Sequence, residues 1–161
     1  MTTASFPVRR AHPFHLILVG GLLAGLLDIT YACFFWRFKA GLPAGRIFQS
    51  VAAGLLGEAS FEGGSATAAL GLGLHFSIAL GMALAYYLAA RRRPALARRP
   101  LRYGPVYGLG LYAFMNYVVL PLSAAGRGSR DPLWIGLSVL VHIALVGLPI
   151  AGFAGRAAAE G

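Results

Sequence analysis

Four polar side chains each stand within a different long apolar stretch of the chain: Asp28, His75, Asn116 and His142. Counted along helices at 1.5 Å per residue, all four lie roughly 12–16 Å below the same end of their stretches. That depth is close to the middle of a hydrocarbon core about 30 Å thick. A charged side chain there is costly and normally finds a partner. We therefore expect one buried polar layer in which Asp28 pairs with His75 or His142.

Three interpretations of this layer remain open. In the first, the four residues form a structural clamp, satisfying one another and fixing the register of the helices. In the second, they line a proton or ion path, because Asp and His inside membranes commonly form relays. In the third, His75 and His142 are axial ligands of a haem iron, or bind zinc together with Asp28. No metal ligand is assigned, because the spacing contains no pair of histidines four residues apart.

A second acidic feature lies between the first two apolar stretches, where Glu58 and Glu62 are four residues apart. This pair either concentrates cations at the outer mouth of the layer or belongs to a solvated loop. The sequence contains no nucleophile–base motif, phosphate loop or dinucleotide fingerprint. We therefore expect a protein that is not an enzyme and has no cofactor, with haem or metal as the alternative.

The composition indicates which elements must hold these residues. Apolar residues make up 58% of the 161-residue chain and charged residues 12%, whereas a soluble domain has about a quarter charged residues. This excludes an ordinary globular enzyme, and the high hydrophobicity excludes disorder. The 22 glycines suit membrane helices, where small residues permit close contact between backbones. The single cysteine, Cys33, excludes an intrachain disulfide.

The apolar stretches predict four transmembrane helices, over about 14–36, 66–90, 103–124 and 132–154. A shorter apolar segment, about 44–57, is too short to span a membrane and predicts an interfacial or re-entrant helix. The expected fold is an all-α membrane protein. One domain, residues 1–161, would hold four transmembrane helices in an antiparallel bundle, with the short helix between spans one and two.

Small residues recur every four positions along three of the predicted spans, which places them on one face of each helix. Such faces either pack the spans of one bundle together or join two copies of the chain. We expect packing within the bundle and leave a homo-oligomer open. The positions concerned are Gly21 and Gly25; Gly73, Ser77, Gly81, Ala85 and Ala89; and Gly104 and Gly108.

The basic residues predict the orientation of the chain. Six of the 14 lie in the segment 91–102, which we interpret as a cytoplasmic loop. Nine basic residues then fall inside and five outside, which favours cytoplasmic N- and C-termini. The segment also predicts contact with anionic lipids of the bilayer; it is too short and lacks the interleaved aromatics needed for nucleic-acid binding. Its basic residues are Arg91, Arg92, Arg93, Arg98, Arg99 and Arg102.

Four segments, 53–57, 63–68, 74–76 and 115–123, resemble a family of small bacterial four-helix inner-membrane proteins with no characterised function. The resemblance covers most of the chain and implies a bacterial inner membrane, but it transfers no functional residue. The expected role is that of a non-enzymatic accessory or structural membrane protein. The alternatives are a small ion- or proton-conducting or transport protein, and a bis-histidine haem or metal-binding redox protein.

Overall fold

The computed structural model describes residues 13–126 and 128–160, and within these ranges it contains helices, short connections and no strand. Four helical stretches are long and apolar enough to cross a membrane, which confirms the all-helical fold and the number of candidate spans. The first two are α1 (Pro13–Ala40) and α3 (Gly64–Arg92). The third comprises α5 (Pro100–Phe114), the π-helical turn η2 (Met115–Val119) and α6 (Leu120–Leu122). The fourth comprises α7 (Pro132–Val141), the π-helical turn η3 (His142–Gly147) and α8 (Leu148–Glu160).

The arginine-rich segment 91–102, predicted to be a loop, is largely helical. Helix α3 continues to Arg92, a short helix α4 covers Pro94–Arg98, and α5 begins at Pro100. The physical reason is that proline suits the first turn of a helix, where its missing N–H would have no partner. Both Pro94 and Pro100 start helices, so little of the segment remains a loop. The third span also ends at Leu122 rather than at residue 124.

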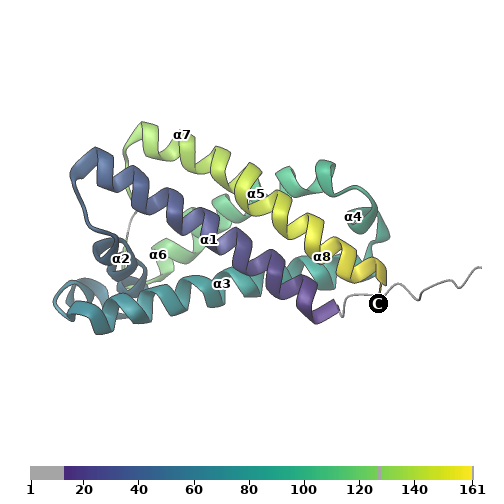
Figure 1. Ribbon diagram of the computed structural model, residues 1–161. Coiled ribbons are helices and arrows are strands. Elements are labelled where there is room, and N and C mark those ends of the chain that lie inside the picture. The colour runs from purple at the N-terminus through teal and green to yellow at the C-terminus, as the bar shows by residue number, and fades with distance from the viewer. Residues whose placement is uncertain (1–12, 127, 161) are drawn as a thin grey trace, which may run out of the picture.

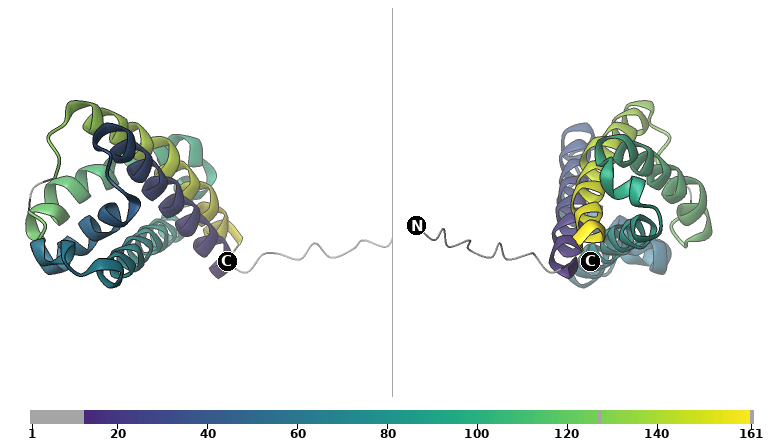
Figure 2. Two further views of the ribbon diagram at one scale, coloured as in Figure 1. Left: turned by 60° about the vertical axis from the view of Figure 1, so that its left-hand side comes forward. Right: turned by 90° about the vertical axis from the view of Figure 1, so that its right-hand side faces the viewer.

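The first and fourth spans form the centre of the assembly. Helix α1 packs along α3 and α8, and α8 also packs against α3 and α5 (Figure 1). Helix α5 packs on η3 and α8, whereas its backbone stays apart from that of α3 and the two helices meet through side chains. At the end of the molecule opposite α4, the short helix α2 (Ala44–Leu56) lies between α3 and the third span (Figure 2). The four spans therefore do not contact one another equally.

Helix α2 is followed by a 3₁₀ turn, η1 (Gly57–Phe61), and matches the predicted short helix at 44–57. Its contact with α3 is close, because a Cβ on Gly71 would collide with the carbonyl oxygen of Phe48. Gln49 adds a hydrogen bond from its Nε2 to the Gly64 carbonyl oxygen, at 3.0 Å. On its other side, the Gly54 carbonyl accepts a 3.0 Å hydrogen bond from the Ala124 backbone N–H. Helix α2 is thus held both to α3 and to the connection after α6.

Most of the buried core lies in the half of the molecule nearer α4. Tyr86, Leu111, Val146 and Ile150 meet there, together with small residues such as Ala24. Small residues also permit the closest helix contacts, which agrees with the prediction of packing within the bundle for two of the three faces. On α1, a Cβ on Gly21 would lie 2.9 Å from Leu80 Cδ2. On α5, a Cβ on Gly108 would collide with the His142 carbonyl oxygen.

The small-residue face of α3 behaves differently. Gly73, Ser77, Gly81, Ala85 and Ala89 are all exposed, and a Cβ added at Gly73 or Gly81 would meet no atom within 4 Å. For this helix the prediction of packing within the bundle is wrong. The reason is that His75 on the opposite face turns toward the interior of the assembly, so the ridge must face outward.

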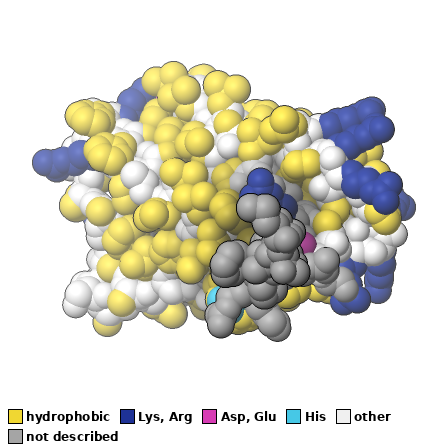
Figure 3. Space-filling model, turned by 45° about the vertical axis from the view of Figure 1, so that its right-hand side comes forward, with side chains coloured by type: hydrophobic (Ala, Val, Ile, Leu, Met, Phe, Trp, Pro, Cys, Tyr) yellow, Lys and Arg dark blue, Asp and Glu magenta, His cyan; other side chains and the backbone are white. Residues whose placement is uncertain are grey.

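The outer surface is broadly apolar (Figure 3). Large side chains such as Leu26, Phe34, Leu88 and Phe114 are at least half exposed. Lys and Arg side chains gather at the two ends of the face shown in Figure 3. Exposed apolar area of this extent marks a membrane-contacting surface, and the position of the cations suits a lipid-facing belt between two polar ends.

Candidate functional site

A cavity of about 640 Å³ brings all four residues of the predicted polar layer together. Asp28, His75, Asn116 and His142 line it, one from each span, and α2 contributes part of the wall. The lining reaches from mid-molecule to exposed residues at the α2 end of the assembly. The deepest lining residues include Ala24, Met82 and Val146, and those at the α2 end include Arg46, Gly128 and Ser129.

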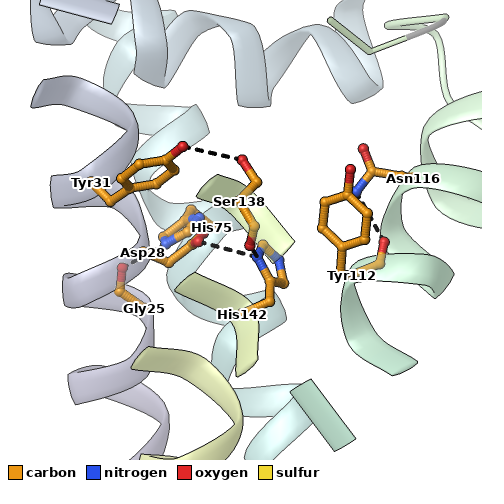
Figure 4. Close-up of polar contacts among 8 residues, drawn as sticks. All are labelled: Gly25, Asp28, Tyr31, His75, Tyr112, Asn116, Ser138 and His142. Atoms are coloured by element: carbon orange, nitrogen blue, oxygen red, sulfur yellow. Dashed lines mark hydrogen bonds and ion pairs between the residues drawn. The ribbon is translucent and has the colours of Figure 1, made fainter. Parts of the chain in front are cut away.

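Asp28 and His142 are the members of the layer that contact each other. Their Oδ1 and Nδ1 atoms are 3.8 Å apart, and the side chains are about a quarter and a sixth exposed (Figure 4). The same His142 Nδ1 lies 2.9 Å from the Ser138 carbonyl oxygen. Because a carbonyl oxygen can only accept, Nδ1 must carry the hydrogen. The predicted pairing of Asp28 with one of the two histidines is therefore made by His142.

His75 and Asn116 are each bonded to backbone instead of to the other layer residues. His75 Nε2 donates to the Gly25 carbonyl oxygen at 2.8 Å, and Asn116 Nδ2 donates to the Tyr112 carbonyl oxygen at 2.9 Å (Figure 4). Among the described residues, no hydrogen bond joins either side chain to Asp28. The layer shares one cavity without forming a mutually bonded cluster.

These bonds determine which hydrogen-bonding groups the cavity offers to a ligand. Each imidazole uses an N–H on a backbone carbonyl, so a neutral ring keeps its other nitrogen as an acceptor: Nδ1 of His75 and Nε2 of His142. Asn116 keeps its Oδ1 free as an acceptor. Within the described residues, the nearest polar contact of the Asp28 carboxylate is His142, at 3.8 Å. The layer is therefore richer in free acceptors than in free donors.

Both π-helical turns carry a residue of the layer. Asn116 lies in η2 and His142 opens η3. Single π-helical turns inside α-helices are rare and are often found at functional sites. At η3 the wider turn directly faces α5, where the absence of a side chain at Gly108 accommodates the His142 carbonyl. The local backbone thus helps to position two of the four side chains.

Sequence reasoning missed three residues that support the site. The Tyr31 hydroxyl lies 3.5 Å from Ser138 Oγ, and the Tyr112 ring meets the His142 ring edge-on, with centroids 5.4 Å apart. Their spacing from the layer residues could have identified them in the sequence. Tyr31 is three residues after Asp28, Ser138 is four before His142, and Tyr112 is four before Asn116, so each shares a helix face with a layer residue.

Aromatic side chains surround the cavity near its α2 end. The rings of Trp36 and Trp134 have centroids 5.3 Å apart, and both residues line the cavity. Arg46 lies 4.3 Å above the Phe61 ring and donates a hydrogen bond to the Phe61 carbonyl. This cation–π contact holds the Arg46 guanidinium at the α2 end.

The predicted acidic pair lies outside this lining. Glu58 belongs to η1 and Glu62 to the turn after it, and both are exposed. Neither lines the cavity among the described residues. The described part of the chain also holds no group of three His, Cys, Asp or Glu side chains arranged to bind a metal ion.

Comparisons of the chain with protein-family models, with curated proteins and with solved structures give no match.

Proposed function

We propose that this protein binds a small cation in the cavity of about 640 Å³ and carries it across the membrane. The observation that supports this proposal is the set of free acceptors around Asp28. A cation that carries hydrogen-bond donors would satisfy the carboxylate and the free acceptor atoms of His75, Asn116 and His142 together. A membrane-buried aspartate is costly without such a partner.

An anion fits the cavity less well. The carboxylate of Asp28 would repel it, and the donors of the two imidazoles are already bonded to backbone carbonyls. Arg46, at the α2 end, is bonded to the Phe61 carbonyl and stacked on the Phe61 ring. The charge and hydrogen-bond pattern of the layer therefore favours a positively charged ligand.

The half of the molecule nearer α4 supplies a barrier to passage. Tyr107 donates a 2.7 Å hydrogen bond to the Met82 carbonyl, and Tyr86 donates a 3.0 Å bond to the Leu96 carbonyl. The two rings meet edge-on at 4.9 Å. Transport in this proposal requires these contacts to open, so the protein would be a carrier rather than an open channel.

We also propose a location and an orientation. The resemblance noted above supports a bacterial inner membrane. The distribution of basic residues supports cytoplasmic termini, the arginine-rich segment 91–102 on anionic headgroups, and α2 at the outer interface rather than re-entrant. Arg9, Arg10 and Arg127, which entered that count, lie outside the described residues. In this orientation the cavity faces outward.

The structural clamp remains the alternative, and vesicle flux separates the two. Guanidinium is a suitable probe, because it is a small permanent cation that offers only donors. We expect purified protein in lipid vesicles to take up labelled guanidinium, and expect Asp28→Asn to abolish uptake at an unchanged protein level. Glu58→Gln, an exposed acid outside the cavity, is the matched control and should keep full uptake.

Wild-type uptake no greater than that of empty vesicles would contradict the transport proposal. If Asp28→Asn then lowers the thermal stability of the protein, the clamp explains the layer.

A further inference from the structure

A second, apolar cavity of about 340 Å³ lies between α3 and α5. Gly81 and Ala85 form its α3 side and Phe114 part of its α5 side; Gly81, Ala85 and Phe114 are exposed on the outer surface. None of the described residues that line it is charged. We call this cavity the α3–α5 groove. It lies where the backbones of these two neighbouring spans stay apart.

The groove adjoins the polar cavity, and four side chains form a shared wall between the two. Ile78 and Met82 of α3, and Met115 and Val119 of η2, line both. These flexible or branched apolar side chains are therefore what separates the polar layer from the outer surface. Methionine in particular can change rotamer at low cost and adapts to different shapes.

Contacts on either side of the α3–α5 groove limit it to one level along the two spans. Toward one end, α2 covers the gap, through its contact with Gly71 and through the hydrogen bond between Ala124 and Gly54. Toward the other end, the Tyr107–Met82 hydrogen bond joins α5 to α3. The groove lies between these two closures, beside the layer of polar residues.

We infer, on the basis of the proposed function, that the substrate is a cationic amphiphile whose headgroup binds at Asp28 and whose alkyl tail lies in the α3–α5 groove. A polar-lined cavity next to an apolar groove, with only adaptable side chains between them, matches a ligand with one charged and one hydrocarbon end. From His75 to Ala85 the path along α3 is roughly 15 Å, long enough for an alkyl chain. The exposed groove allows the tail to remain in contact with lipid.

The absence of a side chain at Gly81 makes room for the tail and offers a direct test. Gly81 lines the groove and a Cβ there meets no atom within 4 Å, so Gly81→Leu adds a side chain at the groove without a clash at its Cβ. Gly73→Leu is the matched control: Gly73 lies two turns earlier on the same exposed face, is equally unobstructed and lines neither cavity. Both changes replace glycine by a better helix former.

The experiment compares binding of guanidinium and octylguanidinium to protein in lipid nanodiscs. The alkyl chain partitions into the lipid equally for every variant. The ratio of octylguanidinium affinities between two variants therefore reports on the groove alone. We expect Gly81→Leu to weaken octylguanidinium binding roughly tenfold, as for a side chain forced into occupied space, and to leave guanidinium binding unchanged. Gly73→Leu should change neither.

Equal octylguanidinium affinity in wild type and Gly81→Leu would overturn the inference while leaving the proposed function intact. An equal loss of both ligands in Gly81→Leu would also overturn it, because the groove would then have no selective role. Binding of neither ligand to the wild type would instead reject the proposed function itself.

Discussion

Asp28 on α1 and His142 on the fourth span lie next to each other in the wall of the cavity, with Oδ1 3.8 Å from Nδ1. The same nitrogen is 2.9 Å from the Ser138 carbonyl oxygen. The carboxylate thus approaches an imidazole whose orientation is already fixed by its own helix. This leaves most of the hydrogen-bonding capacity of Asp28 for a ligand.

The contact between Asp28 and His142 should be measurable as a coupling energy. In a double-mutant cycle with Asp28→Asn and His142→Ala, we expect a coupling of about 0.5–3 kcal/mol in the free energy of unfolding, as for residues in direct contact. Asp28→Asn combined with Asn116→Ala is the control. Those two side chains line the same cavity without a bond, and their effects should add within about 0.5 kcal/mol. Equal coupling in both cycles would contradict a specific Asp28–His142 interaction.

Gly108→Ala tests the contact between α5 and η3. The new methyl group would collide with the His142 carbonyl oxygen, so we expect the free energy of unfolding to fall by about 1–3 kcal/mol. Gly110→Ala, two residues further along α5, meets nothing within 4 Å and should leave stability unchanged or raise it, because alanine favours the helix. Thermal unfolding in detergent compares the two, and equal stability of both variants would show that α5 does not approach η3 so closely.

The ion pair between Lys39 and Asp131 predicts a dependence of stability on pH. The Lys39 ammonium, 2.8 Å from Asp131 Oδ2, lowers the pKa of that carboxyl, and the Trp134 N–H at its other oxygen adds to the effect. A lowered pKa stabilises the folded state above the ordinary pKa of aspartate, near 4, and this contribution disappears as the pH falls through the folded-state value. The wild type should therefore be more stable than Lys39→Met at pH 6.

On acidification the two melting temperatures should converge. Lys39→Met is the preferred variant, because it keeps the Asp131 side chain that caps α7 through Trp134. A difference between the two proteins that stays constant from pH 6 to pH 3 would show that the ion pair does not contribute.

The hydrogen bond from Tyr107 to the Met82 carbonyl joins α5 to α3 beside the groove. Tyr107→Phe removes it, and we expect a loss of about 1 kcal/mol in the free energy of unfolding together with faster amide exchange around Met82. Tyr117→Phe is the control, since the Tyr117 side chain is exposed and makes no hydrogen bond among the described residues. Equal stability of the two variants would mean that the Tyr107 hydroxyl is dispensable for holding the spans together.

Absorption spectroscopy of the purified protein tests the haem alternative. The proposed function assigns the cavity to a small cation rather than to haem, so we expect a near-ultraviolet band from the two tryptophans and seven tyrosines and no Soret band. A near-stoichiometric Soret band that is lost in His75→Ala or His142→Ala would instead identify a membrane cytochrome.

Hydropathy and helix periodicity were enough to predict several features correctly. The four apolar stretches predict the four candidate spans, because a helix must hide its backbone polar groups from lipid over about 20 residues. That Asp28, His75, Asn116 and His142 lie at a common level, where they line one cavity, follows from the same counting, since rise per residue is constant. The short helix α2 also follows from its length. These features depend on local sequence and on the solvent around a single helix.

Only the tertiary structure decided how the helices turn toward one another. The sequence contains three similar small-residue faces, yet those of α1 and α5 pack inside while that of α3 faces outward. The rotation of α3 depends on His75 reaching the Gly25 carbonyl of another span, which no pattern within α3 encodes.

Helix packing also decided which polar residues of the layer contact another side chain and which are bonded to backbone carbonyls. Depth along a helix brings four polar groups to one level, but it does not specify the space between them. Close contacts at Gly108 and Gly21 join some spans, α2 keeps α3 apart from the third span, and the space left between them is the cavity. The sequence therefore determined which polar residues lie at one level of the four candidate spans, whereas helix packing determined that they line a cavity.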